Sequence, residues 1–105
     1  MTKATAISSA DIEARLANLP GWSFQDNALV KEHNFSSYLS ALDFVYALGH
    51  EAEEADHHPE ISLNHKKATI KWSTHSAGGV TDADFQMARR SQVLIDEVSA
   101  ESGVN

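Results

Sequence analysis

Pro59 separates two stretches with different hydrophobic periodicities, and this is the strongest constraint on the fold. Proline disfavours the α conformation for the residue before it, so a helix reaching this point must end by about His57. Upstream, apolar residues recur with the spacing of one helix face, whereas downstream they alternate as in two strands. The helical set is Tyr38, Ala41, Leu42, Val45, Leu48, Ala52 and Ala55, and the alternating set is Ile61, Leu63, Ala68, Ile70 and Trp72.

The predicted helix over 38–56 carries more apolar residues than one buried face needs. Ser36 or Ser37 can cap its start, while Phe44 and Ala47 widen its apolar stripe. Packing against a sheet accounts for the main stripe. The wider stripe also fits a subunit interface on the other side, because small domains often cover such a helix by oligomerising. The sequence leaves both interpretations open.

The remaining patterns predict two further helices and two further strands. A helix over 9–19 begins at a cap by Ser8 or Ser9, and Pro20-Gly21 ends it. Strands over 22–24 and 28–35 flank a two-residue turn at Asp26-Asn27. The last helix begins near 82 and ends at 98 or 99, with Thr81 and Asp84 as a variant capping box and Val80 and Phe85 as a hydrophobic staple. The order α-β-β-α-β-β-α predicts an α+β fold, in which three helices pack on one face of a four-stranded antiparallel sheet.

Length and composition limit the classes of function. A chain of 105 residues predicts one domain over 1–105, with residues 1–7 as a flexible leader. The net charge of −7 argues against nucleic acid, which needs a basic face. No apolar run approaches the roughly 20 residues of a membrane span, no signal-peptide core is present and there is no cysteine. We therefore expect a cytoplasmic protein that binds neither nucleic acid nor membrane.

The predicted hairpin after Pro59 has a register that brings three histidines to one end of the sheet. A turn centred on His65-Lys66 sets apolar residues opposite apolar residues, and a slip by one residue would break every such pair. Cross-strand neighbours lie about 5 Å apart. The inner pairs are Leu63 with Ala68 and Ile61 with Ile70; continued outward, Pro59 faces Trp72, and Asp56, His57 and His58 face His75, Thr74 and Ser73.

The acidic residues beside these histidines are unusual for a helix end. Glu51, Glu53, Glu54 and Asp56 lie where the helix dipole disfavours negative charge, and Glu53 shares a helix face with His57 if the last turn holds. Histidines held by carboxylates suit proton transfer near neutral pH. A solvated acidic patch, general acid–base chemistry and a zinc site with three histidines and a carboxylate all fit the spacing.

Other candidate features carry less weight. His33, His50 and His65 lack a comparable group of neighbours, and we interpret them as surface residues. Gly78-Gly79 lies between a strand and a helix but lacks the lysine and the length of a phosphate-binding loop.

The motif around Pro59 closely resembles that of the pterin-4a-carbinolamine dehydratase family. The matching run is Glu53-x-x-Asp56-His57-His58-Pro59-Glu60, followed by Thr74-His75 and then by Gly79-x-Thr81-x-x-Asp84. Leu19-Pro20-Gly21-Trp22 and the spacing of Phe35, Ala41 and Phe44 extend the resemblance over nearly the whole chain after residue 10.

This resemblance implies a specific reaction. The family dehydrates 4a-hydroxytetrahydrobiopterin, or a similar 4a-hydroxytetrahydropterin, to the quinonoid dihydropterin and water in tetrahydrobiopterin recycling. The catalytic positions fall on His57, His58 and His75, and the supporting positions fall on Glu53, Asp56, Pro59, Thr74 and Asp84. The resemblance also implies a homodimer or homotetramer, a functional link to an aromatic amino-acid hydroxylase, and no metal or other cofactor, because the pterin is the substrate.

The chemistry needs a general acid at the 4a-hydroxyl and a general base at N5. We expect His58 and His75 to flank the reacting centre and His57 to bind or polarise the substrate, with Glu53 setting the protonation of His57. Asp84 has two candidate roles, in the site and in capping the last helix.

Two departures and two alternatives remain. Ile61 replaces an aromatic residue of some members, and His65 replaces a tyrosine of many. The first alternative is a non-catalytic protein-association module that uses the long helix, and the second is a metal-dependent hydrolase or metal carrier.

Overall fold

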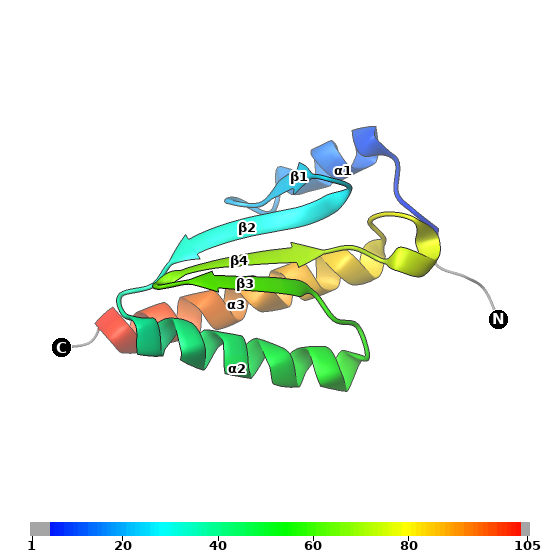
Figure 1. The fold of residues 1–105 in the computed structure, drawn as a ribbon. Helices are drawn as coiled ribbons and strands as arrows, with labels where there is room; N and C mark the ends of the chain where they lie inside the picture. The colour runs from blue at the N-terminus through cyan, green and yellow to red at the C-terminus, as the bar shows by residue number, and fades with distance from the viewer. Residues whose placement is uncertain (1–4, 104–105) are drawn as a thin grey trace.

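The computed structural model describes residues 5–103, and their fold is the predicted α+β arrangement (Figure 1). Three α-helices and four strands follow one another in the predicted order. They are α1 (Ser9–Leu16), β1 (Ser23–Gln25), β2 (Ala28–Asn34), α2 (Tyr38–Ala55), β3 (Glu60–Asn64), β4 (Lys67–Trp72), the short 3₁₀ helix η1 (His75–Ala77) and α3 (Asp82–Gly103).

The four strands form one antiparallel sheet in the order β1-β2-β4-β3. Helices α2 and α3 run side by side across one face of it, and α1 lies beside β1 at the far edge (Figure 1). The β3–β4 register is the predicted one, with Leu63 opposite Ala68 and Ile61 opposite Ile70. The end of α2 and the loop after β4 lie toward the same end of the molecule (Figure 1).

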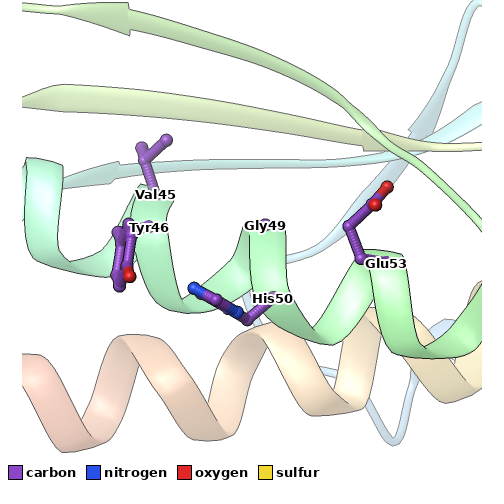
Figure 2. A pocket seen from close by; sticks show the side chains of 5 residues that line it. All are labelled: Val45, Tyr46, Gly49, His50 and Glu53. Atoms are coloured by element: carbon purple, nitrogen blue, oxygen red, sulfur yellow. The ribbon is translucent and has the colours of Figure 1, made fainter.

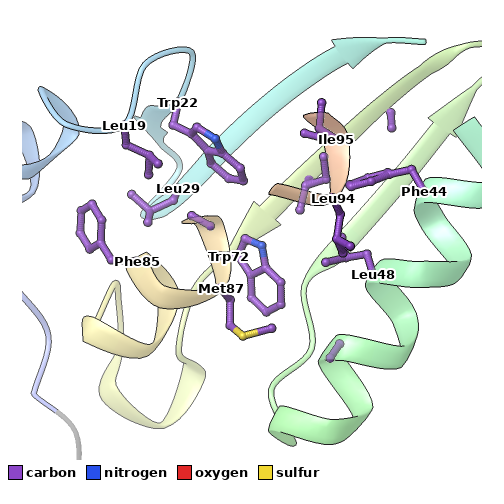
Figure 3. Packing of buried hydrophobic residues seen from close by; sticks show 14 of the residues in the cluster. Leu19, Trp22, Leu29, Phe44, Leu48, Trp72, Phe85, Met87, Leu94 and Ile95 are labelled. Carbon is purple, nitrogen blue, oxygen red and sulfur yellow. The ribbon is translucent and has the colours of Figure 1, made fainter. Parts of the chain in front are cut away.

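The core fills the space between the sheet and the two long helices (Figure 3). Trp72 of β4 is fully buried, and its indole N–H donates to Ser91 Oγ of α3 at 2.9 Å. Ser91 in turn donates to the Met87 carbonyl oxygen at 2.7 Å. These bonds pair the indole N–H of Trp72 and the hydroxyl of Ser91, both of which would be costly to bury without a partner. They also fix the position of Trp72, which becomes one wall of the candidate site.

Some boundaries differ from those predicted. Helix α1 ends at Leu16 rather than near residue 19, because the chain tightens into a turn in which the Leu19 amide donates to the Leu16 carbonyl oxygen at 3.0 Å. Helix α3 continues to Gly103, beyond the predicted end at 98 or 99. The predicted turn is present: Asp26 and Asn27 have φ angles of 51° and 61°, as a tight two-residue hairpin turn requires.

The start of the described chain lies against the loop after β4. The Ile7 amide donates to the Val80 carbonyl oxygen at 2.8 Å, and the Ile7 side chain packs against the core. Residues 1–4 of the predicted leader lie outside the described residues. Among the described helices, none is both long and apolar enough to cross a membrane.

Candidate active site

The end of α2 determines where the two adjacent histidines point. Asp56 adopts the left-handed conformation with φ 52°, and the amide of His57 donates back to the Ala52 carbonyl oxygen at 3.1 Å. This closing motif ends the helix and redirects the chain. The prediction that Glu53 shares a helix face with His57 is therefore wrong, because the helical spacing stops at Ala55. The Asp56 side chain is solvent-exposed, so its observed contribution is the turn of the backbone.

His57 points inward and is held by a buried carboxylate. Its Nε2 lies 2.6 Å from Asp84 Oδ1, and its ring packs against Trp72 with centroids 5.3 Å apart. The Asp84 side chain is wholly buried, and the His57 side chain is 20% exposed. This short contact and the packing against Trp72 hold the His57 ring from two sides. The pair therefore fixes the orientation of His57.

The second oxygen of Asp84 joins this pair to the start of α3 and to the loop after β4. Oδ2 accepts from the Thr81 amide at 2.9 Å and from the Thr74 hydroxyl at 2.7 Å. The Thr81 hydroxyl lies 2.9 Å from that of Thr74. Asp84 thus caps α3, as the capping-box pattern predicted, and holds His57 at the same time. The two roles weighed for Asp84 coexist because each uses a different carboxylate oxygen.

His58 points the other way and pairs with Glu53. Its Nε2 lies 2.5 Å from Glu53 Oε2. Both side chains are exposed, at 54% for His58 and 78% for Glu53. The partner predicted for His57 therefore belongs to His58, since adjacent residues of an extended segment face opposite sides. Pro59 follows, half-buried, and leads directly into β3.

His75 lies in a separate loop at the same end of the sheet. The loop runs from Thr74 to Gly79, which form an isolated β-bridge, and His75 begins the 3₁₀ helix η1 within it. His75 is exposed and lines a cleft of about 250 Å³ together with Thr74, Lys71 and Glu60. Thr74 therefore links the buried His57–Asp84 pair to the loop that carries His75.

The predicted facing of His57 and His58 with the residues after Trp72 is not formed. The β3–β4 ladder ends at Glu60 opposite Lys71, and Thr74 pairs with Gly79 instead. Pro59 and the left-handed Asp56 turn the preceding segment out of the ladder. The structure thus places the three histidines near one end of the sheet but not in one cluster. Within the described residues, no group of three or more His, Cys, Asp or Glu side chains could hold a metal ion.

A second hollow, of about 300 Å³, lies along α2 (Figure 2). Gly49 lies at its centre, between Val45 and Glu53, one helical turn away on either side. Figure 2 shows Val45 and Glu53 pointing toward the strands, with Tyr46 and His50 on the adjacent side of the helix. A Cβ added at Gly49 would meet no atom within 4 Å, so the helix surface is open at this point. Of the residues that line this hollow, Glu53 is the one that belongs to the histidine pairs described above.

Several features of the site were missed from the sequence. The hydrogen bond from Thr74 to Asp84 and the contact of His57 with Trp72 depend on three-dimensional packing.

His33, predicted to be a surface residue, is instead partly buried: it packs edge-on against Phe35, and its Nε2 lies 3.3 Å from Ser99 Oγ. Burial lowers the pKa of His33, and the charge of Lys31 lowers it further. Its inward position follows from its pairing with Ala68 in the sheet.

The sequence matches the family model described as pterin 4 alpha carbinolamine dehydratase over residues 5–94. The chain belongs to this family. Its relatives include two proteins named "Putative pterin-4-alpha-carbinolamine dehydratase". The one from Picosynechococcus sp. is 41% identical over 81% of this chain and 92% of the relative, and the one from Roseiflexus sp. is 42% identical over 90% and 98%.

Solved structures of this dehydratase family share the fold. A transcriptional coactivator/pterin dehydratase from Brucella melitensis superposes with a TM-score of 0.82 at 28% identity, covering 86% of this chain and 98% of that one. A pterin dehydratase-like protein described as a RuBisCO assembly factor in the alpha-carboxysome gives a TM-score of 0.61 at 27% identity, covering 70% and 88%. The names of these two structures describe dehydratase, coactivator and assembly roles for those proteins.

Proposed function

We propose that this protein dehydrates a 4a-hydroxytetrahydropterin, of which 4a-hydroxytetrahydrobiopterin is the type, by histidine acid–base catalysis. The observation that carries the proposal is the hydrogen-bond chain from His57 through Asp84 to Thr74, beside the cleft lined by His75. These hydrogen bonds hold the His57 imidazole at the same end of the sheet as the loop that carries His75. The substrate links the reaction to an aromatic amino-acid hydroxylase, whose turnover would produce it.

The reaction needs two proton transfers and no change of oxidation state. An imidazolium donates a proton to the 4a-hydroxyl, the C4a–O bond breaks and water leaves. A neutral imidazole removes the N5 proton, and the electron pair of that N–H bond completes the C4a=N5 double bond. The atoms and electrons balance with water as the second product, so the reaction calls for an acid and a base but for no oxidant or reductant.

The exposure of each histidine supports a division of these roles. His58 and His75 are exposed and can exchange protons with solvent between turnovers. His57 is largely buried and locked by Asp84, which suits binding or polarising the pterin. We therefore assign proton transfer to His58 and His75, with His57 as the orienting group. Glu53 holds His58, and Asp84 and Thr74 hold His57 and the adjacent loop.

A direct assay tests the proposal. The 4a-carbinolamine is generated in solution and its loss is followed with and without the protein. We expect acceleration by the wild type, and a fall in kcat of about 10²- to 10⁴-fold for His58→Ala and for His75→Ala. His65→Asn serves as the matched control, because His65 lies in the distant β3–β4 turn at φ 54° and asparagine tolerates that conformation. A wild-type rate equal to that of buffer would refute the proposal.

A second candidate function is protein association through the outer side of α2. Tyr38, Leu39 and Tyr46 are 49%, 70% and 72% exposed on this helix, which is unusual for large apolar groups in one stripe. The names of two structural relatives, a transcriptional coactivator and an assembly factor, favour such a role. A homodimer or homotetramer through this face is the simplest form of it, and it is compatible with catalysis.

The oligomeric state in solution tests this second function. Light scattering over a dilution series should give a multiple of 11.5 kDa for the wild type and a smaller mass for the double variant Leu39→Glu/Tyr46→Glu. Glu13→Lys, on the exposed side of α1, is the control for a change of charge. A monomeric wild type at all concentrations would rule out self-association by this face.

A further inference from the structure

The turn between β1 and β2 holds the loop that carries His75. Asn27 occupies the second position of this turn at φ 61°, and its Nδ2 donates to the Gly78 carbonyl oxygen at 2.8 Å. The two residues are 51 positions apart in sequence. This contact therefore joins two separate segments at the end of the sheet.

The loop itself is short and closed by its own backbone. The amides of Thr74 and Gly79 donate to each other's carbonyl oxygens at 2.9 and 3.3 Å, and the Gly78 amide donates to His75 at 3.0 Å. His75 and Ser76 within it are exposed. A segment with little buried apolar surface has low local stability, so a contact from outside has a large influence on its order.

Gly79 shows that the fit against Asn27 is close. A Cβ added at Gly79 would lie 3.2 Å from Asn27 Oδ1 and 3.5 Å from Asn27 Nδ2. Gly79 is buried although it lies in a loop. The Asn27 amide group thus lies against the backbone of residue 79 while it hydrogen bonds to residue 78. The two contacts restrain the loop at its C-terminal end, and the Thr74–Asp84 bond restrains the other end.

Asn27 and His75 line the same cleft of about 250 Å³. We propose that Asn27 is a positioning residue for the dehydratase reaction: its side chain clamps the 74–79 loop so that His75 faces the cleft in a productive geometry. This inference rests on the proposed function. It assigns a role to a residue outside the histidine motif, and the role needs no contact between Asn27 and the pterin.

Two substitutions at Asn27 separate the clamp from the turn. Asn27→Gly removes the amide while glycine keeps the positive φ of the turn, so the hairpin persists. Asn27→Asp replaces the amide donor with a carboxylate that faces the Gly78 carbonyl oxygen. It should lower kcat at least as much as Asn27→Gly does. His65→Gly is the matched control, because it introduces glycine into the β3–β4 turn at a residue whose φ is also positive, 54°.

The measurements are steady-state kinetics and backbone amide order parameters. For Asn27→Gly we expect kcat to fall about 10- to 100-fold with KM within twofold, because misplacement of a catalytic group affects the chemical step. The order parameters of the amides of residues 75–79 should fall toward the flexible range below about 0.6. His65→Gly should change neither quantity.

The outcomes distinguish the two proposals. An active wild type with an unchanged kcat in Asn27→Gly would overturn the positioning role, as would loop amides that stay as ordered as in the wild type. A wild type without activity would refute the dehydratase function itself. In that case the order parameters would still decide whether Asn27 clamps the loop.

Discussion

His57 and His58 are neighbours in sequence, and each pairs with a carboxylate, but the two pairs lie in opposite environments. Asp84 is wholly buried and accepts from two further donors, the Thr81 amide and the Thr74 hydroxyl. Glu53 is 78% exposed at the end of α2 and has His58 as its partner. The left-handed turn at Asp56 produces this division, because it ends the helix one residue before the pair.

This difference separates two uses of the same chemical group. A buried carboxylate with all its donors in place is pre-organised, and removal of one member leaves others unpaired. An exposed pair is screened by water and contributes at most about 1 kcal/mol to stability. The buried pair therefore holds a ring in place, whereas the exposed pair leaves its ring open to proton exchange.

The largest expected effect comes from the buried pair. Asp84→Ala removes the acceptor for the Thr81 amide, the Thr74 hydroxyl and His57 together. Loss of a helix cap costs about 1 kcal/mol, and buried donors left unpaired cost about 1–3 kcal/mol, so we expect a loss of about 2–4 kcal/mol. Urea unfolding followed by circular dichroism measures it.

Asp82→Ala is the matched control for this prediction. Asp82 lies in the same first turn of α3 but is exposed, and it pairs with Arg15 at 2.7 Å. Its replacement should lower the free energy of unfolding by less than about 1 kcal/mol. Equal losses for the two variants would mean that general charge at the start of α3, rather than the buried network, accounts for the effect.

The exposed pair should affect activity without affecting stability. Glu53→Gln removes the charge beside His58 and should lower kcat about tenfold, less than the roughly 10²- to 10⁴-fold contribution of an acid–base group itself. The free energy of unfolding should stay within about 0.5 kcal/mol of the wild-type value, as for surface substitutions in general.

Glu54→Gln provides the comparison for the exposed pair. It removes the same charge one residue along, from a side chain that is also exposed. Its kcat should match that of the wild type. If Glu53→Gln and Glu54→Gln behave alike, the hydrogen bond between Glu53 and His58 has no role in turnover, and the exposed pair is only part of an acidic surface.

Local sequence rules predicted most of the fold, and they did so where one periodicity dominates. The helix over 38–56 and the β3–β4 hairpin both depend on apolar spacing, and the structure has them with the predicted register. The ends were less accurate where competing turns decide the boundary. Leu19 kept its buried position although its helix ends at Leu16, so burial was predicted better than conformation.

The sequence identified the residues of the candidate site, but it did not predict which histidine pairs with which carboxylate. The family motif identified His57, His58, Asp84 and Glu53, but their partnership depends on one backbone angle at Asp56. Extrapolating a strand register through a proline failed for the same reason. The Asn27 contact could not be predicted, because no periodicity relates a hairpin turn to a loop 51 residues away.

His33 is a third histidine for comparison, and it contacts a serine hydroxyl rather than a carboxylate. Its replacement should have the smallest effect of those considered, on the pH dependence of stability. His33 Nε2 lies 3.3 Å from Ser99 Oγ, and the pKa of His33 lies below the ordinary value of 6.5 because of burial and the charge of Lys31. Asp96 acts in the opposite direction, since its carboxylate raises that pKa. The folded state therefore disfavours the imidazolium form of His33.

The sign of the pH dependence follows from this shift. The unfolded chain takes up the His33 proton more readily than the folded chain, so the stability from neutral His33 is complete above pH 6.5 and falls as the pH drops through the folded pKa. His33→Gln keeps a side-chain partner for Ser99 without a titrating group. The difference in free energy of unfolding between wild type and variant, measured from pH 7.5 to 5, should therefore shift against the wild type as the pH falls. A difference independent of pH would mean that His33 is as accessible to protons as an exposed histidine, and that packing against Phe35 does not desolvate it.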